Sequence, residues 1–221
     1  MLRLVVISNP VAFEGEATLI NELFIAGLEC LHLRKPGINP DALALLLQEI
    51  EPRFYGRIAL HQCHELAKGF GITRLHFTET ARRLAGNAAI AAEPLGVHTS
   101  SGEYWQQLHD EGYTVSTSLH DLGELSACEI FDYVFYGPVF NSISKAGYNS
   151  TLAPGFKLGP AAGVRAGTLP EIIAVGGIEI SNLLQIKEMG FAGAALLGTL
   201  WLTPEKAVER FTELKELTND Q

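Results

Sequence analysis

Short apolar runs alternate with stretches of helical periodicity along most of the chain. The runs that we expect to be strands cover residues 2–8, 28–34, 57–61, 73–77, 114–118, 131–137, 171–177 and 193–198. Each is a nearly continuous apolar segment, which is typical of parallel strands buried on both faces. After the first run, Leu19, Leu23 and Ala26 recur at helical intervals, and similar patterns follow nearly every other run.

Helix boundaries are signalled most clearly at two places. Asn39 followed by Pro40 predicts a capped helix that ends before Pro52, since proline is tolerated in the first helical turn. Thr203 followed by Pro204 predicts a capped start for the last helix of the chain. We also expect helices at residues 63–71, 119–128 and 179–190.

Eight strands, nearly all followed by a helical pattern, predict parallel strand–helix units. Eight such units in 221 residues match the count and size of a (β/α)8 TIM barrel. We therefore predict an α/β fold that forms one barrel domain over residues 1–221, with a doubly wound open sheet as the alternative. Residues 81–113 exceed a plain connection, so we expect an enlarged segment there with one helix around residues 103–111.

Composition narrows the class of partner. The chain is 47% hydrophobic and 19% charged, which suits a compact domain. Its net charge of −9 argues against nucleic acid or an anionic membrane as the main partner, since both demand a basic face. No run reaches the roughly 18–20 apolar residues of a membrane helix. We expect a soluble, cytoplasmic protein whose three cysteines, Cys30, Cys63 and Cys128, are reduced.

Polar residues and glycines gather where the predicted strands end, which is where TIM barrels carry their chemistry. The glycines of "AVGGI" and "LLGT" follow the last two strands, in the pattern of a barrel phosphate site. A tight turn is the alternative explanation of Gly176 and Gly177. Arg34 and Lys145 are the candidate cations for a phosphate or diphosphate, and the hydroxyls of Ser142 and Ser144 add neutral donors.

Several histidines also stand at strand ends. His120 follows the fifth strand, where a neutral imidazole could move a proton near pH 7 or could instead cap the next helix. His32, His61 and His76 suggest a metal site, but they fall on three strands without HxH or HExxH spacing, so we do not predict zinc. Cys63 is expected to be a bystander.

These residues resemble one known family, thiamine phosphate synthase and its TenI relatives, which include a thiazole tautomerase. The resemblance rests on "LHLRKP", "VSTSLH", "DYVFYGPVFNSISK", "IIAVGGI" and "GFAGAALLG", and covers nearly the whole chain apart from residues 81–113. It implies a TIM barrel, usually a homodimer. The synthases join a pyrimidine diphosphate to a thiazole phosphate with Mg²⁺ and release pyrophosphate.

The resemblance assigns roles by position. Arg34, Ser118, Ser142, Ser144 and Lys145 would bind phosphates, and Lys145 would also be catalytic. Gly176, Gly177, Gly198 and Thr199 would hold the thiazole phosphate, and His120 would move the proton in a tautomerase.

Departures from the synthase pattern fall on the pyrimidine side. The Asn-Asp pair after strand three is replaced by His61 and Gln62, and the lysine of strand two by Pro36. Ala81 stands near the place of a second aspartate, which leaves Glu79 as the one nearby carboxylate. Mg²⁺ prefers hard oxygen ligands, so this change removes most of its site.

From the resemblance we favour a TenI-like thiazole-phosphate tautomerase that needs no metal cofactor. A Mg²⁺-dependent thiamine-phosphate synthase is the first alternative, with Glu79 as its one candidate metal ligand. A catalytically silent barrel that binds thiazole or thiamine phosphates, or a partner protein, is the second.

Overall fold

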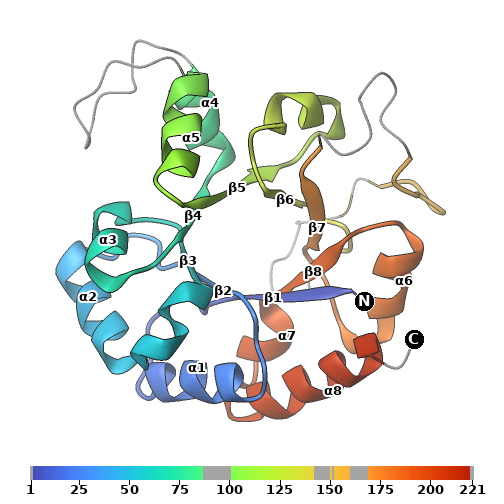
Figure 1. Cartoon of the computed structure of the whole chain (residues 1–221). Coiled ribbons are helices and arrows are strands. Elements are labelled where there is room, and N and C mark those ends of the chain that lie inside the picture. Colours follow the sequence, from blue (N-terminus) through green and yellow to red (C-terminus); the bar gives the residue numbers. More distant parts are fainter. Residues whose placement is uncertain (1, 87–100, 142–149, 151, 160–168, 220–221) are drawn as a thin grey trace.

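Eight parallel strands close into a barrel in the order of the sequence (Figure 1). The computed structural model describes residues 2–86, 101–141, 150, 152–159 and 169–219. The strands are β1 (Arg3–Ile7), β2 (Leu31–Leu33), β3 (Ile58–Leu60), β4 (Arg74–Phe77), β5 (Thr114–Leu119), β6 (Tyr133–Tyr136), β7 (Glu171–Val175) and β8 (Gly193–Leu196). The predicted TIM barrel is confirmed, and the open doubly wound sheet is excluded because β1 pairs with β8 as well as with β2.

Helices surround the barrel (Figure 1). They are α1 (Glu16–Ile25), α2 (Pro40–Glu49), α3 (Ala67–Phe70), α4 (Glu79–Gly86), α5 (Ser101–Asp110), α6 (Leu183–Glu188), α7 (Gly198–Trp201) and α8 (Ala207–Asn219). Short 3₁₀ segments cover Pro52–Arg57, His64–Leu66, Leu122–Cys128, Ile180–Asn182 and Pro204–Lys206. None of the helices in these described ranges is long and apolar enough to cross a membrane.

The predicted helix boundaries are confirmed in part. Asn39 caps α2, where its Oδ1 accepts the Ala42 N–H at 2.8 Å. The cap at Thr203 is wrong, because its side chain makes no capping hydrogen bond and a 3₁₀ turn precedes α8. After β5 the expected α-helix is a 3₁₀ segment, which Asp121 opens by accepting the Gly123 N–H at 2.8 Å.

The enlarged connection after β4 carries two helices. The expected helix near residues 103–111 is α5, and its buried Trp105 packs edge-on against Phe77 of β4. Helix α4 was not predicted from the sequence, and its first residue is Glu79. Residues 87–100 lie outside the described part of the chain.

Two apolar cores result from the alternation of side chains along each strand. Residues that point outward, such as Leu31 and Val134, pack against the helices. Those that point inward form a small core within the barrel: Val5, Ile7, Cys30, Ala59, Tyr133, Phe135, Ile173 and Ala195. Polar side chains share this interior, since His32, His76 and Ser116 are buried on the inward-facing positions of their strands. Buried polar groups are costly unless they are hydrogen-bonded.

Candidate functional site

The predicted site residues that the structure describes lie at one end of the barrel. All eight strands are parallel in a closed barrel, so the residues just after each strand ring the same opening. Arg34 follows β2, His61 and Gln62 follow β3, His120 follows β5, Gly176 and Gly177 follow β7, and Gly198 and Thr199 follow β8. Ser118 lies near the end of β5. Ser142, Ser144 and Lys145 lie outside the described residues.

Arg34 is held at this opening by its main chain. The Ser8 hydroxyl accepts the Arg34 N–H at 2.9 Å and donates to the Arg34 carbonyl at 3.1 Å, which ties the ends of β1 and β2 together. The half-buried guanidinium lies close enough to His61 and His76 to lower the pKa of both imidazoles, after the larger effect of burial. Its positive charge therefore acts within the opening, as phosphate binding requires.

Lys35, the next residue, is committed elsewhere. Its ammonium is buried and paired with the buried carboxylate of Glu16, and it also donates to the Asn9 carbonyl at 2.7 Å. Gln62 contacts the same segment, since its Nε2 donates to the Lys35 carbonyl at 2.9 Å. Lys35 therefore holds the loop after β1 in place. It does not take over the role of the family's lysine, at whose position this chain has Pro36.

His120 is paired with a carboxylate. Its Nδ1 lies 2.5 Å from Oε2 of Glu79, at the start of α4. The His120 side chain is 55% exposed, whereas that of Glu79 is only 16% exposed. A carboxylate on one ring nitrogen fixes the orientation of the imidazole and leaves the other nitrogen for a reacting group. This pairing was not predicted, because α4 itself was missed.

Glu79 is engaged by cations as well. Arg83 donates to its Oε1 at 2.8 Å, and Arg82 lies 3.8 Å from the same oxygen. Both arginines also bond Glu124, in the 3₁₀ segment after β5, which joins α4 to that segment. A carboxylate with these partners is a poor ligand for Mg²⁺, which would have to displace them.

The Mg²⁺ site of the synthases does not fit the described residues. The carboxylate of Glu79 is occupied, and the residues after β3 supply an imidazole and an amide in place of carboxylates. Within the described residues, the one cluster with metal-ligand geometry consists of histidines, which are nitrogen ligands. Mg²⁺ selects oxygen ligands, so this cluster does not replace the missing aspartates.

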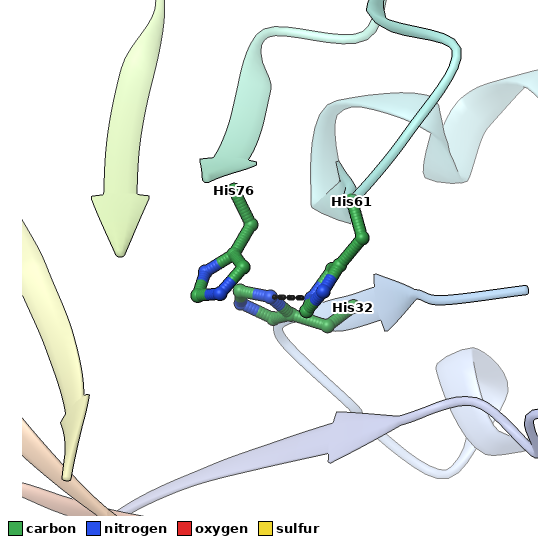
Figure 2. A group of neighbouring side chains, drawn as sticks. All are labelled: His32, His61 and His76. Carbon is green, nitrogen blue, oxygen red and sulfur yellow. Dashed lines mark hydrogen bonds between the residues drawn. The ribbon is translucent and has the colours of Figure 1, made fainter. Parts of the chain in front are cut away.

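Three histidines meet inside the barrel (Figure 2). Ligand atoms of His32, His61 and His76 lie within 4.8 Å of one another. These histidines therefore lie together although their spacing in the sequence matches no local metal-binding motif. His32 Nδ1 and His61 Nε2 share a hydrogen bond of 2.8 Å, and the rings of His61 and His76 are stacked at 4.0 Å between centroids.

Oxygen atoms lie within hydrogen-bond distance of this cluster. The Tyr133 hydroxyl lies 2.7 Å from His32 Nε2. Ser116 Oγ lies 2.9 Å from Nδ1 of His76, and Ser118 Oγ lies 3.0 Å from its Nε2. Ser118, predicted as a phosphate ligand, is thus a hydrogen-bond partner of His76. Tyr133 and Ser116 were missed, although their alternation with outward-facing residues on β5 and β6 signals an inward orientation.

The histidines of the cluster are neutral at neutral pH. Burial, with smaller contributions from His64 and Arg34, lowers the pKa of His76 to about 3. Burial also holds the pKa values of His32 and His61 well below the ordinary value. Burial raises the pKa of the Tyr133 hydroxyl, which stays protonated. Each imidazole therefore keeps one N–H and one lone pair.

The two glycines after β7 are packed against the loop after β6. Gly176 and Gly177 have positive φ angles of 97° and 65°, and a Cβ on Gly177 would lie 2.3 Å from the Asn141 carbonyl oxygen. The Val139 N–H donates to the Val175 carbonyl and the Phe140 N–H to that of Gly176, at 3.0 and 3.1 Å. The tight-turn explanation thus accounts for both glycines, and close packing of the loops accounts for their small size.

Thr199 has a structural partner too. Its hydroxyl donates to the Ile178 carbonyl in the loop after β7, and its carbonyl accepts from Arg210 of α8 at 2.9 Å. Thr199 follows Gly198 at the start of the short α7. These bonds align the loops after β7 and β8 side by side, which is the arrangement of a barrel phosphate site.

Cys63 carries no sign of reactivity. It is half-buried, has a positive φ of 54°, and burial, with a smaller effect of Glu65, raises the pKa of its thiol. A thiol with a raised pKa is a poor nucleophile, so the bystander interpretation agrees with the structure. The three cysteines are free.

Comparison with known proteins points to one family. The family described as thiamine monophosphate synthase matches residues 4–200. A Geobacter sulfurreducens protein, named provisionally as a thiamine-phosphate synthase, is 24% identical over 184 residues, covering 81% of this chain and 76% of its own length. A structure titled thiamine phosphate pyrophosphorylase from Bacteroides thetaiotaomicron has a TM-score of 0.67 and 25% identity, covering 99% of this chain and 98% of its own. The fold is shared with a Pyrococcus furiosus structure of the same title, at a TM-score of 0.66 and 14% identity, over 99% of this chain and 96% of that one.

Proposed function

The chain belongs to the thiamine monophosphate synthase family, and from this premise we propose that it is a thiazole-phosphate tautomerase with His120 as its proton carrier. Membership makes it a thiamine-pathway enzyme with a barrel that receives small phosphorylated substrates. The observation that carries the choice of reaction is the pair of His120 and Glu79, 2.5 Å apart at the opening.

A tautomerisation needs a base that removes a proton from carbon and an acid that returns one elsewhere on the same molecule. The His120 imidazole serves as both, since the proton that it accepts can be delivered to the second position. Glu79 stabilises the imidazolium between these two steps because its carboxylate lies against Nδ1. No atom is gained or lost, and the chemistry requires no leaving group.

The substrate phosphate would bind between the loops after β7 and β8. Gly176, Gly177, Gly198 and Thr199 would surround it, as the family pattern implies. Arg34 and Ser118 lie at the ends of β2 and β5 around the same opening. Ser142, Ser144 and Lys145 would add donors, as the family pattern implies. His61 and Gln62 would contact the rest of the substrate.

A thiamine-phosphate synthase is the second candidate, and the names of the relatives favour it over the tautomerase. Its reaction would require Mg²⁺ or other cations to neutralise the departing pyrophosphate. The described residues do not fit Mg²⁺. Lys145 and Arg34 would then carry the neutralisation.

One set of assays separates these reactions. Purified protein is given the thiazole phosphate alone without Mg²⁺, and separately the pyrimidine diphosphate and thiazole phosphate with Mg²⁺. The tautomerase proposal expects isomerisation in the first assay and a loss of about 10²–10⁴-fold in His120→Asn and His120→Ala. Unchanged rates in both variants would remove His120 from the mechanism. Thiamine phosphate formed only in the second assay would establish the synthase instead, and ligand-dependent thermal stabilisation with neither product would indicate a silent binding protein.

A homodimer is also proposed, on the resemblance alone. Light scattering of the purified protein tests it by the molar mass.

A further inference from the structure

The histidine cluster inside the barrel lies apart from the residues proposed for proton transfer. His32, His61 and His76 come from the neighbouring strands β2, β3 and β4, and their rings converge in Figure 2. We propose that these three imidazoles bind a divalent transition-metal ion of the zinc class. The inference does not rest on the proposed function, and its test needs no substrate.

The ligand type selects the class of ion. Three imidazole nitrogens with no carboxylate suit Zn²⁺, Co²⁺, Ni²⁺ or Cu²⁺, whereas Mg²⁺ and Ca²⁺ require oxygen ligands. Neutral imidazoles are the form that binds a metal, and burial keeps all three neutral at neutral pH. The ion therefore does not have to displace a proton from a charged imidazole when it binds.

The separations need only a small adjustment. Zn–N bonds of about 2.0–2.1 Å in a tetrahedral site place ligand nitrogens about 3.3 Å apart. His32 Nδ1 and His61 Nε2 are 2.8 Å apart, so the ion must push these two rings apart by a few tenths of an ångström. The ligand atoms all lie within 4.8 Å of one another, so any pair farther apart than about 3.3 Å must move closer when the ion enters.

The oxygen atoms around the cluster are placed to bond the ring nitrogens that would not bind the metal. A ligating histidine almost always donates its other N–H to an oxygen, which fixes the ring and its tautomer. With Nδ1 of His32 on the metal, its Nε2–H would donate to the Tyr133 hydroxyl, now 2.7 Å away. Whichever nitrogen His76 offers to the ion, the other keeps a serine hydroxyl, either Ser116 or Ser118.

Metal binding does not change the number of protons on the cluster, but it moves a proton from one ring nitrogen to another. In the metal-free form one imidazole must donate to the other across the bond between His32 and His61. When His32 is that donor, entry of the ion moves its proton from Nδ1 to Nε2, where Tyr133 accepts it. Tyr133 can accept because a phenol oxygen has lone pairs, and burial raises its pKa so that it stays a neutral hydroxyl.

Three protein ligands leave one tetrahedral position for water or another small ligand. Ser118 lies on β5, two residues before His120, and its hydroxyl contacts His76. The ion would therefore lie beneath the proposed substrate site.

The experiment uses full-length protein without a histidine tag, treated with EDTA and dialysed. Zn²⁺ is expected to bind at one ion per chain by elemental analysis. At a free Zn²⁺ concentration 100 times the Kd, Tm should rise by roughly 5–10 °C. Co²⁺ should give the intense visible bands of a four-coordinate site, and Mg²⁺ should give no shift.

Variants locate the site. His61→Ala, at the open end of the cluster, should weaken Zn²⁺ binding by more than the roughly 10–100-fold loss expected for Tyr133→Phe. His64→Ala is the matched control. His64 belongs to the same segment and is also half-buried, but its Nε2 bonds the Leu60 carbonyl and it is not part of the cluster. Absence of Zn²⁺ binding to the wild type would overturn the proposal, and so would equal affinity in wild type, His61→Ala and His64→Ala. The cluster would then be a hydrogen-bonded stack without metal.

Discussion

Glu79 Oε2 lies 2.5 Å from Nδ1 of His120. Glu79 begins α4, which follows β4, and His120 directly follows the neighbouring strand β5. We predict that Glu79→Gln lowers the isomerisation rate on the order of tenfold, because the amide supports the ring but does not stabilise its protonated form. Initial rates of the wild type and the variant, with kcat and KM determined separately, measure the loss.

Arg83→Gln is the control for that variant. Arg83 contacts Glu79 and Glu124 but not His120, so its loss should weaken the ion pairs of α4 without removing the carboxylate from the imidazole. If Glu79→Gln lowers Tm but leaves the isomerisation rate as in the wild type, Glu79 has only a structural role.

Stability should fall as the pH is lowered from 7 to 5. The buried His32 and His76 have lowered pKa values when folded, so the unfolded chain binds more protons once the pH approaches 6.5. Each of these two imidazoles should cost roughly 2 kcal/mol of unfolding free energy between pH 7 and pH 5. Urea unfolding at several pH values measures the slope.

His76→Asn isolates one contribution to this slope. The variant should be less stable at pH 7 because it leaves Ser116 and Ser118 with a smaller partner. Its stability should nevertheless depend less steeply on pH, since one titrating group has gone. An equal slope in wild type and variant would mean that His76 is not the source.

The barrel could be predicted from the sequence because its strands are buried on both faces. Runs such as "LVVI" and "AAL" are apolar regardless of which neighbour they pair with, so their number and spacing indicate the fold. Asn39 and Pro40 also predicted a helix start correctly, because helix capping depends on residues that are adjacent in the sequence. By contrast, α4 was not predicted, although Thr78 caps its start by accepting the Ala81 N–H at 3.1 Å, as Asn39 does for α2.

The side-chain arrangement in the site depends on contacts that the sequence does not state. His32 and His61 are 29 positions apart, and they meet because β2 and β3 pair in a fixed register inside a closed barrel. Local spacing rules for metal ligands describe helices and hairpins, so they could not detect three ligands on three strands. The pairing of Glu79 with His120 was equally hidden, since it required α4 and the end of β5 to be adjacent.

The buried ion pair of Lys35 and Glu16 gives a prediction about stability. We expect Lys35→Met to cost about 3–5 kcal/mol, because it leaves the Glu16 carboxylate buried without its partner. The double variant Glu16→Leu/Lys35→Met should be more stable than Lys35→Met alone, since no unpaired charge remains. Urea denaturation of the two single variants and the double variant completes the cycle. A double variant as unstable as the sum of the single ones would contradict a direct coupling.

Gly177 tests whether the loop after β7 needs glycine for its conformation or for its close packing. Gly37 has a positive φ of 78° with open space around it, so Gly37→Ala should cost only the roughly 1–2 kcal/mol of the left-handed conformation. Gly177 has a φ of 65°, and an added Cβ would meet the Asn141 carbonyl oxygen at 2.3 Å and the Phe140 carbonyl carbon at 2.8 Å. Gly177→Ala should therefore cost more than Gly37→Ala by a further 1–3 kcal/mol or so, since the backbone of the neighbouring loop must move.

The same variant probes the proposed phosphate site. Displacing the loop after β6 alters the opening around Gly176 and Gly177, so thiazole phosphate should stabilise Gly177→Ala less than it stabilises Gly37→Ala. Ligand-dependent Tm shifts of the two variants, each relative to its own ligand-free form, separate this effect from the loss of fold stability. Equal ligand-induced shifts in both variants would contradict a phosphate site at this loop, and the glycines would then serve packing alone.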